Sequence, residues 1–141
     1  MGGIDVPHDK HAIGHSDADV LLHAVTDALL GAAALGDIGE MFPNTDPANR
    51  GRDSAEMLQA AYRAVLGSGW RVGNLDCVVL AQRPRLLPYK EAMRRRVAEI
   101  LGVGPERIGL KAKTGELVGT VGREEVIGAQ CVALLEPSEE R

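Results

Sequence analysis

Residues 15–46 of the chain read HSDADVLLHAVTDALLGAAALGDIGEMFPNTD, and this stretch does most to decide the fold. From Asp17 to Leu35 it is rich in alanine and leucine and apolar nearly all round, which is typical of a buried helix. Ser16 stands where an N-cap is expected, and Gly36 ends the pattern. We therefore predict a buried helix followed by a glycine-rich loop.

Two further segments carry helix signals. Residues 54–66 follow Asp53, a good capping residue, and residues 88–101 begin with a proline at the first turn and are followed by Gly102. Three segments rich in β-branched and aliphatic residues read as strands, namely 72–82, 107–113 and 126–136. The order of these segments predicts an α+β fold with one sheet packed against about three helices.

Bulk properties limit the classes of protein that the chain can represent. With 141 residues it is expected to form a single domain over residues 1–141. Its formal charge of −4 gives no basic field for nucleic acid, and the run Arg94-Arg95-Arg96 is expected to be a solvated helix face. The longest apolar run, residues 20–35, is too short and too polar to span a bilayer. We expect a cytoplasmic protein with no membrane or nucleic-acid partner.

The chain has two cysteines, Cys77 and Cys131, and both lie in segments that read as strands. Two thiols form neither a disulfide framework nor a zinc ribbon. We expect them to be buried and reduced.

His23 is the first candidate functional residue. Asp19, His23 and Asp27 are spaced four residues apart, so they lie along one helix face. A metal ion on one ring nitrogen and Asp27 or Asp19 on the other would satisfy a buried imidazole. A core histidine bonded to a neighbouring carboxylate fits the same spacing, so the pattern leaves both interpretations open.

Three loops have groups that suit an anionic ligand. Residues 35–46 are rich in glycine, aspartate and asparagine, although a plain connection has the same composition. Residues 81–88 join a strand to a helix and carry Arg83 and Arg85, which also fit a solvated turn. Residues 111–116 place Lys111, Lys113 and Thr114 at a strand end. None of these loops by itself names a reaction.

The chain resembles the 2-C-methyl-D-erythritol 2,4-cyclodiphosphate synthases of isoprenoid biosynthesis. The resemblance rests on three segments in this order: residues 15–46 quoted above, AQRPRLLP at 81–88 and KAKTGELVGTVGR at 111–123. The resemblance covers nearly the whole chain. It implies a homotrimer with sheets facing the central axis and active sites between neighbouring subunits. It also implies the reaction, in which the 2-phosphate of 4-diphosphocytidyl-2-C-methyl-D-erythritol 2-phosphate attacks the β-phosphorus, the cyclic diphosphate forms and CMP leaves.

The same resemblance assigns site residues. His15 and Ser16 match residues on the 2-phosphate side, with His15 steadying the transition state, and Thr114 matches the hydroxyl that polarises the nucleotide phosphates. The residues that match the methylerythritol side are Asp37, Ile38, Gly39, Phe42, Pro43, Asn44, Thr45 and Asp46. The residues that match the cytidine side and the nucleotide phosphates are Ala81, Gln82, Arg83, Pro84, Arg85, Leu86, Leu87, Lys113, Thr114, Gly115 and Glu116.

The metals implied by the resemblance are zinc and a second divalent ion, magnesium or manganese. His23 matches a zinc ligand, and Glu116 matches the carboxylate ligand of the second ion. Relatives carry two further zinc ligands in an opening strand, Gly-x-Asp-x-His, that precedes the stretch matched by Gly2-Gly3-Ile4. We therefore expect this chain to lack the metal-ligand strand, unless His8 or His11 substitutes.

Two further departures bear on function. The chain reads Lys113-Thr114-Gly115 where relatives carry three threonines, and Thr120 stands where they often carry phenylalanine. Arg123, which matches a residue that meets an isoprenoid diphosphate in the central cavity, is present. These departures keep open an alternative function, a catalytically impaired trimeric paralogue that still binds nucleotide phosphates.

Overall fold

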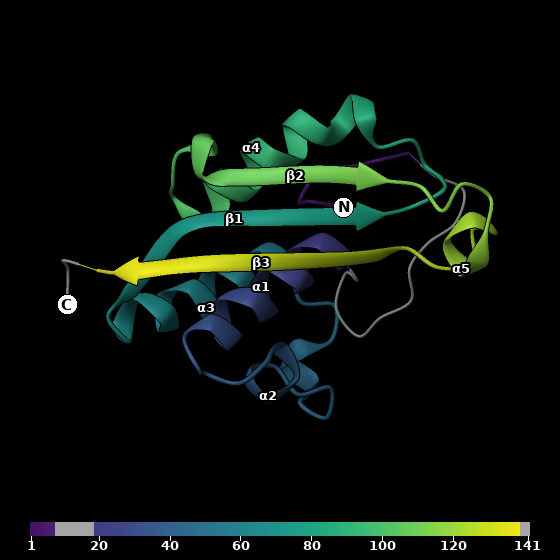
Figure 1. Cartoon of the computed structure of the whole chain (residues 1–141). Coiled ribbons are helices and arrows are strands. Elements are labelled where there is room, and N and C mark those ends of the chain that lie inside the picture. Colours follow the sequence, from purple (N-terminus) through teal and green to yellow (C-terminus); the bar gives the residue numbers. More distant parts are fainter. Residues whose placement is uncertain (8–18, 139–141) are drawn as a thin grey trace.

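The computed structural model describes residues 1–7 and 19–138, and a mixed sheet organises them (Figure 1). Its strand order is β2-β1-β3, with β1 in the middle. β2 runs parallel to β1 and β3 runs antiparallel to it, so Leu75 faces Ile108 on one side and Ala133 on the other. The strands are β1 (Trp70–Leu80), β2 (Ile108–Lys113) and β3 (Gly128–Pro137).

The parallel pair requires a crossover connection, because the chain must return to the start of the sheet before β2 begins. A 3₁₀ turn, Leu87–Tyr89, leads into α4 (Lys90–Leu101), and a second 3₁₀ turn, Pro105–Arg107, leads into β2. Gly102 ends α4 with a φ of 68°, a left-handed conformation that glycine adopts without a steric penalty.

Two long helices, α1 (Val20–Ala32) and α3 (Ser54–Gly67), precede the sheet in sequence. Each begins at an aspartate whose side chain accepts a backbone N–H of the first turn. Asp19 accepts from Leu22 and Asp53 accepts from Ala55. The shorter helical elements are α2 (Ile38–Met41), the 3₁₀ turn Pro47–Asn49 and α5 (Gly119–Gly122).

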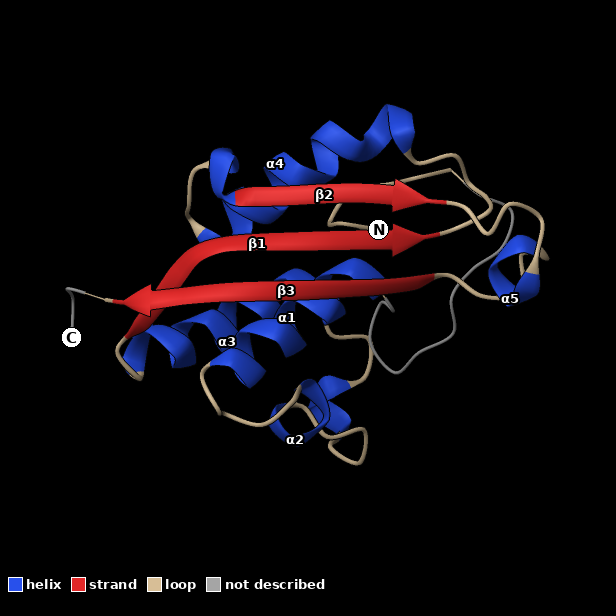
Figure 2. Cartoon of the chain, viewed as in Figure 1, coloured by secondary structure: helices blue, strands red, loops and turns tan. Residues whose placement is uncertain are grey.

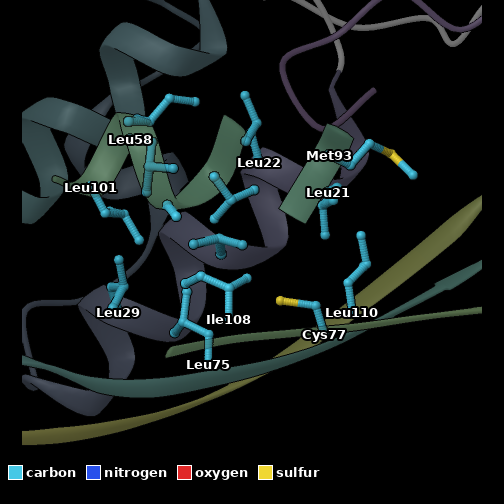
Figure 3. Close-up of a cluster of buried hydrophobic side chains, with 14 of the residues drawn as sticks. Leu21, Leu22, Leu29, Leu58, Leu75, Cys77, Met93, Leu101, Ile108 and Leu110 are labelled. Atoms are coloured by element: carbon cyan, nitrogen blue, oxygen red, sulfur yellow. The ribbon is translucent and has the colours of Figure 1, made fainter. Parts of the chain in front are cut away.

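The three long helices lie on one face of the sheet, as Figures 1 and 2 show. Along β1 the buried residues Leu75, Cys77 and Val79 alternate with more exposed ones, as expected of a sheet with one covered face. Figure 3 shows side chains of the helices and of the strands pointing into one shared core. The residues labelled there are Leu21, Leu22, Leu29, Leu58, Leu75, Cys77, Met93, Leu101, Ile108 and Leu110.

The opposite face of the sheet carries large apolar side chains in contact with solvent. Val132 is 72% exposed and Leu134 is 65% exposed, and both project from β3. No helix in the described part of the chain covers this face (Figure 1). An apolar patch of this kind marks a surface suited to contact another protein chain.

The prediction of an α+β fold with one sheet and about three main helices is confirmed. The predicted bounds of the first helix are wrong at both ends, because Asp19 rather than Ser16 caps it and Ala32 rather than Leu35 ends it. The third helix was predicted to begin at residue 88, but it begins at Lys90, after the 3₁₀ turn Leu87–Tyr89. None of the helices in residues 1–7 and 19–138 has both the length and the apolar composition needed to cross a bilayer.

Candidate active site

The carboxyl ends of β1 and β2 lie side by side, because the two strands are parallel and Leu80 pairs with Lys113. The loops that follow them, residues 81–87 and 114–118, are joined by hydrogen bonds. The amide of Ala81 donates to the carbonyl of Lys113 at 2.9 Å, and the amide of Leu117 donates to Oε1 of Gln82 at 3.1 Å. The two loops therefore form one surface, although more than thirty residues separate them in sequence.

Thr114 is the first residue after β2 on this surface. Its Oγ1 accepts a hydrogen bond from the amide of Glu116 at 3.1 Å, which leaves the hydroxyl hydrogen available to donate to a ligand. Lys113 is exposed beside it, and none of the described carboxylates forms an ion pair with it. One cation and one hydroxyl donor thus stand together at the end of β2.

Two glycines fix the shape of the loop after Thr114. A Cβ added to Gly115 would lie 2.5 Å from the amide nitrogen of Gly122, and a Cβ added to Gly122 would collide with the backbone of Leu117. The loop therefore packs directly on α5, backbone against backbone. Glu116 and Leu117 take positive φ values of 52° and 65°, which non-glycine residues adopt infrequently.

The loop after β1 is anchored at two apolar points. Ala81 and Leu86 are each 4% exposed, and the peptide bond between Arg83 and Pro84 is cis. Arg83 and Arg85 lie between the anchors and are exposed. Their guanidinium groups are therefore open to an anion in solvent.

His23 belongs to a second group of residues, on the helices. Its Nε2 lies 2.8 Å from Oγ of Ser54, the fully buried first residue of α3. The carboxylate of Asp27, one of the two partners expected for His23, accepts from the amide of Ile38 at 2.7 Å. The contact of Ser54 with His23 was not predicted from the sequence, where Ser54 indicated only the start of a helix. The available signal was the position of Ser54 directly after the capping residue Asp53.

The loop of residues 37–46 lies next to this second group. Asp37 caps α2 by accepting from Glu40 at 2.8 Å, and Asp46 accepts from Ala48 at 3.0 Å. Phe42 is only 7% exposed and has the guanidinium of Arg52 4.8 Å above its ring. Phe42 therefore anchors the loop. The same loop holds the other residues predicted for the methylerythritol side, which are Ile38, Gly39, Pro43, Asn44 and Thr45.

The loop of residues 37–46 and the strand ends lie in different parts of the described chain. Figure 2 shows α2, which belongs to this loop, well apart from α5 and the carboxyl ends of β1 and β2. His15 and Ser16, and also His8 and His11, lie outside the described residues. Arg123 lies just after α5, where its Nε is 2.6 Å from a carboxylate oxygen of Glu125.

The predicted metal ligands, His23 and Glu116, do not belong to a complete set of metal ligands in the described part of the chain. Within residues 1–7 and 19–138, no three His, Cys, Asp or Glu side chains lie close enough to share a metal ion. His23 and Glu116 each stand without two further ligands from that part of the chain. The described residues alone therefore do not fit a zinc ion, which takes at least three protein ligands in catalytic sites.

The geometry defines a class: an α+β protein that presents hydrogen-bond donors and cations at the ends of a parallel strand pair, as phosphate-binding enzymes do. Comparison with known proteins then identifies the family. The YgbB family model matches residues 1–136, and the chain belongs to the YgbB family.

Similar proteins and structures agree with this family. The chain is 54% identical to the 2-C-methyl-D-erythritol 2,4-cyclodiphosphate synthase of Gemmatimonas aurantiaca, over 96% of this chain and 81% of that protein. The structure of the bifunctional IspDF from Campylobacter jejuni matches with a TM-score of 0.92 and 40% identity, over 96% of this chain and 37% of that longer chain. A 2C-methyl-D-erythritol-2,4-cyclodiphosphate synthase in its CDP-bound form matches with a TM-score of 0.86 and 38% identity, over 96% and 87% of the two chains.

Proposed function

We propose that the chain is a 2-C-methyl-D-erythritol 2,4-cyclodiphosphate synthase, a phosphorus–oxygen lyase that releases CMP. The observation that carries the proposal is the joined surface of residues 81–87 and 114–118 in a chain that is 54% identical to a synthase of this name. In the reaction, an oxygen of the substrate's 2-phosphate attacks the β-phosphorus. The bond from that phosphorus to the CMP oxygen breaks, and the cyclic diphosphate forms.

This chemistry needs charge stabilisation and alignment rather than a protein nucleophile. Thr114 donates its free hydroxyl hydrogen to a phosphate oxygen as charge builds there, and Lys113 adds a positive charge beside it. Arg83 and Arg85 lie on the neighbouring loop, where they meet the nucleotide. The similar synthase that was solved in a CDP-bound form supports a nucleotide as part of the substrate.

We assign the second group of residues to the methylerythritol half of the substrate. Residues 37–46 would contact the methylerythritol moiety, and His15 and Ser16 would hold the 2-phosphate. Because α2, which lies within residues 37–46, is well apart from the strand ends in one copy (Figure 2), we infer that a complete site needs two copies of the chain. We therefore propose a homotrimer in which each site lies between neighbours and the exposed sheet faces meet near the axis.

The proposal includes two metal ions. His23 would bind zinc, and Glu116 would bind a second divalent ion, magnesium or manganese. Because the described residues alone do not fit zinc, we propose that further ligands come from outside them, such as residues 8–18, a neighbouring copy or the substrate phosphates. A diphosphate itself offers oxygens to magnesium, so Glu116 need not supply a full ligand set.

The remaining expectations are also proposals. The chain would form a single domain around its one core cluster, and an isoprenoid diphosphate would meet Arg123 in the central cavity of the trimer. Arg123 is already paired with Glu125, so that ligand must compete with a carboxylate. The cytoplasmic location expected from the sequence stays a prediction.

The test is a direct assay of the purified chain with 4-diphosphocytidyl-2-C-methyl-D-erythritol 2-phosphate, zinc and magnesium. We expect CMP by liquid chromatography and, in equal amount, the cyclic diphosphate by phosphorus NMR. The catalytically impaired paralogue is the alternative, and the departures at Lys113, Gly115 and Thr120 are the observations that favour it. Binding of CDP without any CMP release would establish that alternative.

A further inference from the structure

Cys77 and Cys131 lie directly opposite each other in the β1–β3 ladder. Their Sγ atoms are 3.3 Å apart, and these two residues are the only cysteines of the chain. Residues that pair across an antiparallel ladder project to the same face of the sheet, so the two thiols meet on the side that the helices cover.

The surroundings of the two sulfurs differ. Cys77 is 1% exposed and is part of the core between sheet and helices, as Figure 3 shows. Cys131 is half-buried, and its strand is an edge of the sheet in the part of the chain that the structure describes. Its neighbours on the same face of β3 are the small residues Ala129 and Ala133. A small molecule therefore needs to pass only the β3 edge to reach the pair.

The contact also shifts the pKa values of the two thiols in opposite directions. The hydrogen bond between the two sulfur atoms lowers the pKa of the Cys77 thiol, although burial opposes this effect. The same hydrogen bond raises the pKa of Cys131. The pair therefore gives up one proton more readily than an isolated thiol and holds the second more firmly.

We propose that Cys77 and Cys131 are a site of reversible oxidation, at which a peroxide converts the two thiols into an intramolecular disulfide. The sulfurs need to close from 3.3 Å to about 2 Å, a movement within reach of side-chain rotation because they already face each other. Neither residue belongs to the two groups assigned to the substrate, so the inference stands apart from the proposed function.

The reaction balances with hydrogen peroxide as the oxidant. The Cys77 thiolate attacks one oxygen, so that an S–O bond forms, the O–O bond breaks and, with a proton, water leaves. The sulfur of Cys131 then attacks the sulfenic sulfur. The S–S bond forms, the S–O bond breaks, and the thiol proton leaves with the hydroxide as a second water. A dithiol reductant reverses the change by thiol–disulfide exchange.

The experiment is peptide mapping of the folded, full-length chain. The chain is treated with hydrogen peroxide, quenched with catalase, denatured, alkylated with iodoacetamide and digested without reductant. We expect the peptide that carries Cys77 to be linked to the peptide that carries Cys131, with neither cysteine alkylated. Dithiothreitol before alkylation should return both as alkylated thiols.

Two controls keep the result specific. Cys131→Ser removes the resolving thiol, so Cys77 should be trapped by dimedone as a sulfenic acid. The wild-type chain oxidised in guanidinium should form the disulfide more slowly than the folded chain, because only folding holds the sulfurs together. Full alkylation of both cysteines after peroxide, sulfinic acid in place of the link, or disulfides between chains on a non-reducing gel would each overturn the proposal.

Discussion

Thr114 directly follows β2, and its hydroxyl oxygen accepts a hydrogen bond from the amide of Glu116, so its hydrogen is available to donate to a bound group. A donor of this kind acts mainly on charge that develops in the transition state. Thr114→Ala should therefore lower kcat by about 10²-fold while KM changes little, by comparison with oxyanion-hole donors. Steady-state assay of CMP release measures both constants.

Thr114→Ser is the matched control, because it keeps the hydroxyl and removes only a methyl group. Its kcat should stay near that of the wild type. If the alanine variant also keeps normal turnover, Lys113 or a metal ion stabilises the charge without help from Thr114, and the role assigned to the hydroxyl is wrong.

His23 leads to a second prediction at the residue scale. Because it is not grouped with two more ligands in residues 1–7 and 19–138, we expect the purified chain to retain much less than one zinc per copy after dialysis. Elemental analysis gives this ratio directly. Stoichiometric zinc would contradict the expectation. Loss of that zinc in His8→Ala or His11→Ala would then place the missing ligands in residues 8–18.

Single-residue roles were predictable only where a local pattern carries them. Asp53 was recognised as a cap because capping needs only neighbours in sequence. The contact between His23 and Ser54 joins residues on two different helices, so no spacing along the chain announces it. The roles of Thr114 and Lys113 came from resemblance, since two polar residues at a strand end are common.

At the scale of elements, the start of α3 offers a test of how the helices are held. The side chain of Asp53 accepts from the amide of Ala55 at 2.9 Å. Asp53→Ala removes that acceptor and should lower the free energy of unfolding by about 1 kcal/mol. Urea denaturation followed by circular dichroism measures the change.

Asp53→Ser preserves a capping oxygen and should lose much less stability than the alanine variant. Equal losses in the two variants would show that the carboxylate acts through its charge near the helix end rather than through its hydrogen bond. Unchanged stability in both would show that the cap is dispensable.

The positions of the elements followed from the sequence better than their ends did. Residues 33–35 continue the alanine- and leucine-rich pattern of α1, so propensity extends the helix through them. In the structure Ala34 instead takes a φ of 59°, and the amide of Leu35 bonds to the carbonyl of Leu30. The irregular register near Val72 and Asn74 in β1 is likewise set by pairing with β3, which no local pattern describes.

At the scale of the whole molecule, the exposed apolar face of the sheet predicts assembly. Leu134 is 65% exposed on that face, and a charge there would have to be buried if three copies meet. We expect light scattering to report a trimer for the wild-type chain and a smaller species for Leu134→Asp.

Gln59→Asp is the matched control, because it adds the same charge on the exposed side of α3. It should remain trimeric. A monomeric wild-type chain would contradict both the assembly and the placement of the active site between subunits, and a trimeric Leu134→Asp variant would place the interface elsewhere.

The division of the candidate site into two separate groups was not readable from residue chemistry alone. The loops after residues 72–82 and 107–113 come together because the two strands are parallel neighbours. Neither the order of strands in a sheet nor their register can be read from the chemistry of single residues. The distance between α2 and the strand ends depends on how all the helices pack (Figure 1). Only resemblance indicated in advance that neighbouring subunits share a site.

The close approach of Gly115 and Gly122 also limits how this sequence can drift over evolutionary time. Gly122 occupies the space that a side chain at position 115 would need, and the backbone of Leu117 occupies the space that a side chain at position 122 would need. Any amino-acid substitution at either position therefore meets backbone rather than a movable side chain. Relief requires the loop and α5 to separate, which alters the position of Thr114 in the same step. Neutral mutation has no gradual route through these two positions, and a lineage that leaves them has to rebuild the loop that carries Thr114.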